Sequence, residues 1–315
     1  MNTPKGSLRR FAQVVTLGVL LLTVVWVALS AAGCSRQPAG RPVTPTPTPA
    51  PAPSPEPSNG TPAPSESPTA LPLPAPTVTV PVRVYFILGE KIAVGTARTA
   101  PAASPARGAI EQLLLGPGQA DKALGLGTTI PSGTKLNSVV IRGGTATVDL
   151  SKRFESGGGS LSMLLRVTQV VCTLTQFPSI KRIAFRLDGR VVESIGGEGI
   201  MVSPPVTRAD FEGQLPAILV ESPLANVTVR RTFRVAGSAN VFEAQFRVSV
   251  LDSKGKVIED EDVRATSGTG TRGTFNASIS YPAGHGGAGK IRFYEPSAKD
   301  GTPVNVVTIP VELSP

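Results

Sequence analysis

Few residues of this 315-residue chain have side chains suited to acid–base, nucleophilic or metal chemistry. The one histidine, His285, lies in the glycine-rich run Tyr281–Gly287, and the two cysteines, Cys34 and Cys172, are far apart. Without a second histidine or a cysteine cluster, a zinc site is not expected. Because His285 lies in a flexible loop rather than at the position of a fixed base, a histidine-based triad is not expected either. The acidic run Glu259–Asp262 lacks the ligand spacing of a calcium loop, so we interpret it as a solvated strand edge. The sequence therefore predicts no catalytic, cofactor-binding or metal-binding residue, and no enzymatic activity.

Two glycine-rich runs could be confused with phosphate-binding loops. Gly157–Gly159 precedes a predicted helix, but no Gly-Lys-Ser/Thr sequence follows it, which favours a hinge. Ile195–Gly199 follows a predicted hairpin and completes no nucleotide motif, which favours an ordinary loop. Neither run supports nucleotide chemistry, and a cryptic hydrolase is the weakest of the alternative functions.

Cys34 is the residue whose surroundings indicate covalent chemistry. Three basic residues at positions 5, 9 and 10 precede the apolar run Val14–Leu29, and small residues then lead directly into Cys34. This order is typical of an export signal, here residues 1–33. Because positive charge is retained inside, the rest of the chain is expected on the outer side of the membrane.

The run Ala31-Ala32-Gly33-Cys34 resembles the lipobox of bacterial lipoproteins, in which the cysteine is acylated and becomes the mature N-terminus. Ala31 departs from that motif, which usually carries leucine there. The resemblance implies that Cys34 is the lipidation site and that the protein is extracytoplasmic and lipid-anchored to the bacterial cell membrane. The alternative is an uncleaved membrane helix over Phe11–Ala32, which is long enough to span a bilayer.

Residues 34–79 are predicted to form a Pro-rich disordered linker. Residues 35–79 contain 15 of the 31 prolines, in runs such as Thr44–Pro49, and almost no large apolar residue before Leu71. Such a segment cannot bury enough surface to fold, which favours an extended spacer. At about 3.1 Å per residue the spacer could reach ~140 Å and hold the following domains away from the membrane.

The charge balance restricts the partners. Removing residues 1–33, which carry three basic residues and no acidic one, lowers the net charge from +9 to +6. This charge favours weak, salt-screened attraction to anionic lipid or wall polymer. No basic helix or aromatic platform is evident, so nucleic acid is not expected as a partner. With Cys34 acylated, Cys172 has no disulfide partner and is expected to be buried.

Residues 80–210 combine strand and helix patterns. Alternating apolar residues predict strands at Val82–Ile87, Leu136–Ile141, Thr145–Leu150 and Ile183–Leu187, the last ending in the two-residue turn Asp188-Gly189. A short helix is predicted from Pro105 to Gly116, with Ser104 as its N-cap. These elements predict an α+β domain with helices on one face of a small sheet.

The clearest helical pattern lies between Gly159 and Pro178. Polar residues recur at steps of three and four and are predicted to form a solvent-facing stripe: Ser162, Arg166, Gln169, Thr173 and Gln176. The other side is predicted to face the core through Leu164, Val167, Val171 and Leu174.

Five blocks of this region occur in the order seen in the GerMN domain of sporulation and germination lipoproteins. They are Leu113–Pro117, Ile130–Thr134, Ala146–Ser151, Thr173–Phe177 and Leu187–Gly189. GerMN domains are similar in fold to the ring-building modules of spore-envelope secretion machinery. The resemblance therefore implies an envelope function and a possible homo-oligomer that closes by head-to-tail contacts.

Residues 217–315 lose the helical periodicity and show short alternating runs, which predicts an all-β immunoglobulin-like sandwich. The predicted strands are Ile218–Val220, Thr228–Arg230, Thr232–Ala236, Glu243–Leu251, Lys256–Glu259, Gly273–Tyr281, Lys290–Tyr294 and Val304–Leu313. Pro310 lies inside the last run and predicts an edge strand.

Several motifs of this region resemble the Gmad-type immunoglobulin-like domain of bacterial spore germination, which commonly accompanies a GerMN domain. They are Ser222-Pro223, Val235–Asn240, Phe242–Ala244, Arg272–Phe275 and Ser297–Gly301. The two resemblances together imply a non-enzymatic envelope lipoprotein of sporulation or germination. Its two domains are expected to bind envelope or spore-assembly proteins. The alternative is a lipoprotein that binds cell-wall polymer, peptidoglycan or another glycan.

Overall fold

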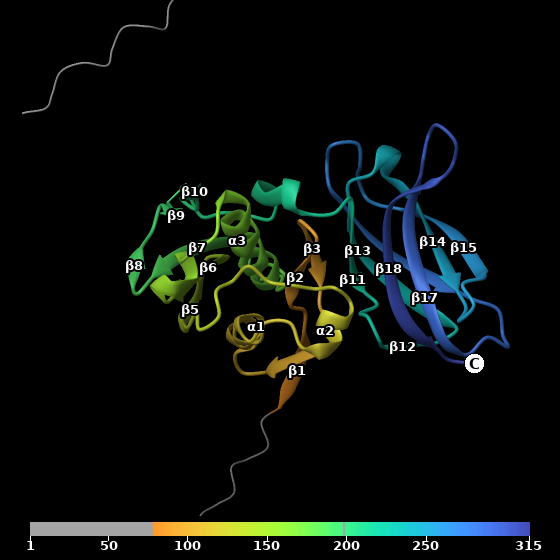
Figure 1. Ribbon diagram of the computed structural model, residues 1–315, viewed down its shortest axis with the longest axis horizontal. Helices are drawn as coiled ribbons and strands as arrows, with labels where there is room; N and C mark the ends of the chain where they lie inside the picture. The colour runs from red at the N-terminus through yellow and green to blue at the C-terminus, as the bar shows by residue number, and fades with distance from the viewer. Residues whose placement is uncertain (1–77, 198) are drawn as a thin grey trace, which may run out of the picture. The chain divides into compact units, whose positions relative to one another are not determined.

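The computed structural model describes residues 78–197 and 199–315 (Figure 1). The predicted export signal (1–33), the predicted lipidation of Cys34 and nearly all of the predicted linker (34–79) lie outside these residues. Within the described ranges, no helix is long and apolar enough to cross a bilayer.

The first part of the fold is mixed α and β. Its main sheet has four strands in the order β5-β6-β7-β8, of which β6 and β7 are parallel and the outer pairs antiparallel. Three further antiparallel pairs, β1–β4, β2–β3 and β9–β10, lie around it. The strands are β1 (Thr79–Val82), β2 (Tyr85–Leu88), β3 (Lys91–Val94), β4 (Arg98–Pro101), β5 (Leu136–Arg142), β6 (Thr145–Leu150), β7 (Arg182–Leu187), β8 (Arg190–Val191), β9 (Ser194–Ile195) and β10 (Ile200–Met201).

Three α-helices accompany these strands, α1 (Pro105–Leu114), α2 (Gln119–Ala123) and α3 (Ser160–Leu174), with a 3-10 helix η1 (Lys152–Glu155) before α3. The first follows Ser104, begins with proline as predicted, and buries Ile110 and Leu113 against the sheet. The predicted strand Val82–Ile87 is divided between β1 and β2. The predicted turn Asp188-Gly189 is confirmed, because both residues have positive φ angles and join Leu187 to Arg190.

The predicted solvent stripe on α3 is wrong. Arg166, Gln169 and Thr173 are at most 2 % exposed. The reason is that their side chains form hydrogen bonds with main-chain groups of other segments. The Gln169 side-chain amide donates to the Tyr85 carbonyl oxygen, and the Tyr85 N–H donates to Thr173 Oγ1. Gln176 both accepts from and donates to the main chain of Arg83.

Arg166 of α3 forms hydrogen bonds with the segment that leads into the glycine run before this helix. Its guanidinium donates to the carbonyl oxygens of Phe154, Ser156 and Gly157. Residues 154–157, the last of which begins the run predicted to act as a hinge, therefore enclose a buried cation and supply three carbonyl oxygens to its guanidinium.

The second part of the fold is a two-sheet β-sandwich. One sheet has the order β11-β13-β16 and the other β12-β18-β17-β14-β15. All eight predicted strands are present: β11 (Ile218–Ser222), β12 (Thr228–Val229), β13 (Thr232–Ala239), β14 (Gln245–Leu251), β15 (Val257–Arg264), β16 (Gly273–Ser280), β17 (Gly287–Pro296) and β18 (Pro303–Leu313). Two further 3-10 helices are η2 (Ala209–Gln214) and η3 (Phe242–Ala244). The predicted fold class, an α+β domain followed by an immunoglobulin-like sandwich, is confirmed.

Aromatic residues hold the two sheets of the sandwich together. Phe275 of one sheet meets Phe246 of the other edge to face, with ring centroids 4.9 Å apart, and Phe293 packs beside them. In the described part of the chain, β12 pairs with β18 only at Glu312 and Leu313, so β18 is the outermost strand of its sheet at Pro310, as that proline predicted. Proline is tolerated at position 310 because the main-chain groups of this residue point away from β17, so the strand pair needs no N–H from it. Its carbonyl oxygen accepts from the Asn226 N–H.

Candidate functional site

The described residues join the α+β part to the sandwich through a polar cluster, here called the junction, of the buried Tyr85 and the partly buried Arg208 and Glu221. Tyr85 lies on β2, Glu221 on β11, and Arg208 directly before η2. The Tyr85 hydroxyl donates to Glu221 Oε1. Arg208 Nη1 donates to the same oxygen over 2.7 Å, and Arg208 Nη2 donates to the Tyr85 hydroxyl over 3.0 Å. Each of the three side chains therefore contacts both of the others.

Arg208 also fixes the cluster to α3. Its Nε donates to Thr175 Oγ1 over 2.6 Å, its Nη2 donates to the Cys172 carbonyl oxygen over 2.9 Å, and the guanidinium lies 5.0 Å from the centre of the Tyr85 ring. A charged guanidinium with this many acceptors and an aromatic face is oriented in one position.

The cluster sets the protonation states of its members. Burial raises the pKa of the Tyr85 hydroxyl well above its usual value, so this group stays a donor. Burial alone would also raise the pKa of the Glu221 carboxyl, but the Arg208 charge and the hydrogen bonds from Tyr85 and Arg208 together lower it. Glu221 is therefore ionised at neutral pH.

The segment between the two parts is held along its length. Arg272 of the sandwich donates through two nitrogens to Glu212 of η2, at 2.8 and 3.0 Å, and also to the Pro216 carbonyl oxygen. On the other side, the Lys91 ammonium of β3 donates to the Gly213 carbonyl oxygen. These contacts, with those of Arg208, tie residues 207–216 to both parts.

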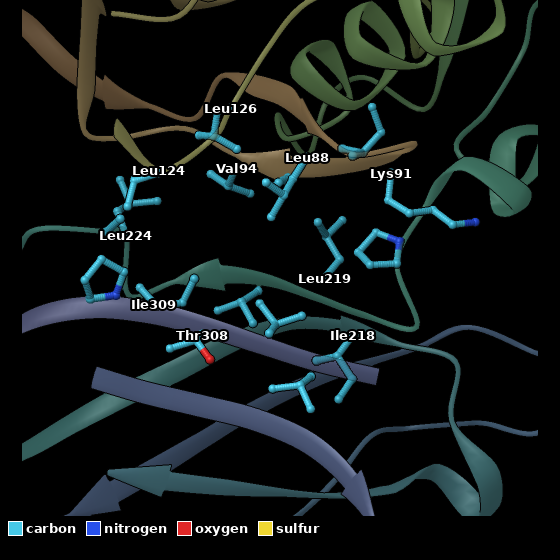
Figure 2. Close-up of a pocket in the computed structure, with 18 of the residues that line it drawn as sticks. Leu88, Lys91, Val94, Leu124, Leu126, Ile218, Leu219, Leu224, Thr308 and Ile309 are labelled. Atoms are coloured by element: carbon cyan, nitrogen blue, oxygen red, sulfur yellow. The ribbon is translucent and has the colours of Figure 1, made fainter. Parts of the chain in front are cut away.

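Beside this cluster lies an apolar groove of about 300 Å³ (Figure 2). Leu88 and Leu126 approach it from the side of the β2–β3 hairpin and α2, and Leu219, Leu224 and Ile309 approach it from the sandwich (Figure 2). Leu88 is 50 % exposed, so the groove opens to solvent. This volume, with its apolar lining and few polar groups, is at the small end of the range for ligand sites.

The other residues singled out in the sequence lie elsewhere. Cys172 is confirmed as buried, and burial raises the pKa of its thiol to about 11, so the thiol is protonated and unreactive at neutral pH. His285 lies in the loop between β16 and β17, and no side-chain hydrogen bond to it is present within the described ranges. The predicted lipidation residue Cys34 is outside the described residues.

The acidic run Glu259–Asp262 lies on β15, the outermost strand of its sheet. Arg247 on β14 lies 3.0 Å from Asp260 and 3.1 Å from Asp262, so both carboxylates are used in ion pairs across the strands. Among residues 78–197 and 199–315, no group of three or more His, Cys, Asp or Glu side chains is arranged to hold a metal ion.

The junction residues were not singled out in the sequence. Tyr85, Arg208 and Glu221 stand in three different local patterns, and no spacing rule connects residues so far apart. The one local signal is that Glu221 breaks an apolar run, Ile218–Val220, just before Ser222-Pro223. Chemically the junction and groove lack an activated nucleophile or a free base, and the arrangement is suited to binding.

Two family models match the described part of the chain. Residues 83–193 match Germane, described as sporulation and spore germination. Residues 217–302 match Gmad2, described as the immunoglobulin-like domain of bacterial spore germination. The first match covers the elements from β2 to β8, and the second covers most of the sandwich. No curated protein matches the chain at a significant level.

Solved structures similar to this chain include two from the sporulation protein GerM of Bacillus subtilis. Its first GerMN domain is 30 % identical over 42 % of this chain and 99 % of that one, with a TM-score of 0.34. Its tandem GerMN domains are 21 % identical over 64 % of this chain and 61 % of that one, with a TM-score of 0.34. A Clostridium perfringens protein provisionally named as a lipoprotein is 24 % identical over 45 % of this chain and 95 % of its own, with a TM-score of 0.32.

Proposed function

We propose, from the premise that this chain carries a Germane domain at residues 83–193 and a Gmad2 immunoglobulin-like domain at residues 217–302, that it is an envelope-anchored lipoprotein of sporulation or germination. Its two domains act by binding other proteins, and it is not an enzyme. The observation that carries this proposal is that two domains, both described by their role in spores, follow one another in a single chain.

The anchor in this proposal is Cys34, acylated after removal of residues 1–33. It holds the protein on the outer face of the cell membrane, and residues 34–79 act as the spacer. The support for the anchor is the sequence pattern that resembles a lipobox. The partners are envelope or spore-assembly proteins, and the chain forms a homo-oligomer through its first domain.

The junction supports a binding function rather than catalysis. Its titratable groups are paired with one another, because Glu221 accepts from both Tyr85 and Arg208. A general base must instead be free to take a proton from a substrate. A fixed arrangement of two domains suits a scaffold that presents two surfaces at a constant spacing.

Deletion of the coding region in a spore-forming host tests this proposal. The expected result is a loss of heat-resistant spores or a delay in germination, restored by the wild-type chain. A chain with Cys34→Ala is expected to leave the membrane fraction and to restore the phenotype poorly, whereas Cys172→Ser is the matched control that keeps Cys34. Unchanged spore yield and germination in the deletion strain would contradict the proposal.

A second candidate function is binding of a cell-wall polymer by the sandwich. The observation in its favour is the net charge of +6 that remains after residue 33, since anionic wall polymers attract basic proteins. Retention of the purified protein on peptidoglycan at low salt, and its release at high salt, is the expected result. Absence of retention at low salt would exclude this function.

A further inference from the structure

The groove beside the junction contains a strand edge with free main-chain groups. Toward the end of β18 and directly after it, the residues at positions 310, 312 and 314 direct main-chain groups away from β17, and these groups are paired. Pro310 accepts from the Asn226 N–H, the Glu312 N–H donates to Val227, and the Ser314 N–H donates to Val229. The neighbouring strand β12 pairs with β18 only at Glu312 and Leu313.

Strand alternation extends this edge toward the start of β18. Successive residues of an antiparallel strand direct their main-chain groups to opposite sides, so Thr308 directs its N–H and C=O away from β17, as Pro310 does. In the described part of the chain, no strand and no loop hydrogen bond reaches this outward side of Thr308. The register with β17 shifts between Val307 and Val304, so the alternation is followed only as far as Thr308. Val306 lies within this shift. Thr308 and Val306 both line the groove.

We propose that this groove binds an extended polypeptide strand of a partner protein, which pairs with the free edge of β18 at Thr308. Added strands of this kind gain affinity from main-chain hydrogen bonds and specificity from pockets for alternate side chains. The opposite wall of the groove supplies such pockets through Leu88, Leu124 and Leu126.

Charge indicates the chemistry of the partner strand. Lys91 lines the groove, and its ammonium makes one hydrogen bond within the described residues, to the Gly213 carbonyl oxygen. An ammonium has three donors, so it can also bind a carboxylate of the partner. The partner strand therefore carries alternating apolar side chains and an acidic residue at the end near Lys91.

The groove also continues an interface that is already formed. Leu219 and Ile92 line it and at the same time belong to the apolar cluster that packs the α+β part against β11. An acyl chain would fill the same apolar space. However, it would cover the N–H and C=O groups of Thr308 without pairing them, which costs free energy. The groove therefore favours a strand over a lipid.

This inference deepens the proposed interaction role, but its test uses purified protein, so its failure would leave the genetic test of the proposed function unaffected. The protein is the chain from Ser35 to Pro315, which keeps every described residue. The probe is the peptide acetyl-Glu-Val-Thr-Val-Thr-Val-amide, titrated against the ¹⁵N-labelled protein. The expected result is a set of amide shifts confined to residues 88–94, 124–126 and 304–309.

Two matched comparisons separate strand pairing from burial of apolar groups. The same peptide N-methylated at every valine and threonine keeps its side chains but loses those amide donors, and it is expected to bind at least about tenfold more weakly. Thr308→Pro removes one outward N–H at a position like that of Pro310 and is expected to weaken binding to a similar extent. Thr308→Val, which keeps the N–H, is expected to bind normally. If Thr308→Pro does not fold, Leu88→Asp, at a half-exposed position, serves as the second variant.

Four outcomes would overturn the proposal. The first is equal binding of the methylated and unmethylated peptides, and the second is groove shifts produced by decanoate but not by the peptide, which would indicate an amphiphile site. The third is groove shifts that appear on raising the protein concentration alone, which would indicate a second copy of the chain. The fourth is groove shifts on internal deletion of Leu71–Thr77, which would indicate that the chain's own segment occupies the groove.

Discussion

Tyr85 and Glu221 are separated by 136 residues in the sequence, and in the fold the Tyr85 hydroxyl donates a hydrogen bond to Glu221 Oε1. Tyr85 belongs to β2 of the Germane domain and Glu221 to β11 of the Gmad2 domain. Arg208 also takes part in this contact, so the two domains are joined by side-chain hydrogen bonds as well as by the chain that connects them.

Replacing Glu221 tests how far the junction contributes to stability. Glu221→Gln leaves the Arg208 guanidinium without its counter-charge in a site where the glutamate side chain is only 18 % exposed. We expect the free energy of unfolding to fall by about 2–4 kcal/mol, measured by urea denaturation. Glu193→Gln, at an exposed position of the Germane domain, is the control and should change stability little. Equal stability of the two variants would show that the junction does not contribute.

The junction also predicts a dependence on pH. The pKa of Glu221 is lowered in the folded protein, by the Arg208 charge and by hydrogen bonds that together outweigh burial. A lowered carboxyl pKa contributes stability that is fully present above the unfolded value, about 4.3, and is lost as the pH falls through the folded value. The stability difference between wild type and Glu221→Gln should therefore be constant from pH 7 to pH 5 and shrink below about pH 4. A difference that stays constant down to pH 2.5 would contradict this assignment.

Cys172 provides a probe of the core of the Germane domain. Burial raises the pKa of its thiol to about 11, so the reactive thiolate is scarce at pH 8. In a chain that starts at Ser35, where Cys172 is the only cysteine, we expect no reaction with Ellman's reagent under native conditions. One thiol per chain should react after unfolding in guanidinium chloride. Rapid labelling of the native protein would mean that α3 opens away from β2.

Gln169 tests the interpretation of the buried polar side of α3. Its amide donates to the Tyr85 carbonyl oxygen and accepts from Thr128 and Thr129. Gln169→Leu fills a similar volume but leaves main-chain groups unpaired, so we expect a loss of about 1–3 kcal/mol in the free energy of unfolding. Gln245→Leu, at an exposed position of β14, is the matched control. A stable Gln169→Leu protein would mean that water replaces the lost hydrogen bonds.

The local features of the fold were predictable from the sequence because local rules determine them. Asp188-Gly189 tolerates the positive φ angles that a two-residue hairpin requires, and alternation in the last hundred residues marked all eight strands of the sandwich. The burial of Cys172 was predicted because a free cysteine without a disulfide partner usually packs as a small apolar residue, and this prediction is confirmed.

Other features depend on groups that are distant in the sequence. The polar residues of α3 have the spacing of a solvent-facing stripe, but Thr173 and Gln169 are buried because β2 needs side-chain partners for its main chain. No periodicity reveals this need. The short strand β12 could not be predicted as the neighbour of Glu312 and Leu313 either, since it comes from a segment about eighty residues earlier.

The way residues 207–216 are held has a mechanical consequence. Arg208 attaches the beginning of this segment to α3 and β11, and Glu212 attaches its middle to Arg272. A torque applied to the Gmad2 sandwich is therefore transmitted to the Germane domain through these side chains, without first straightening a slack tether.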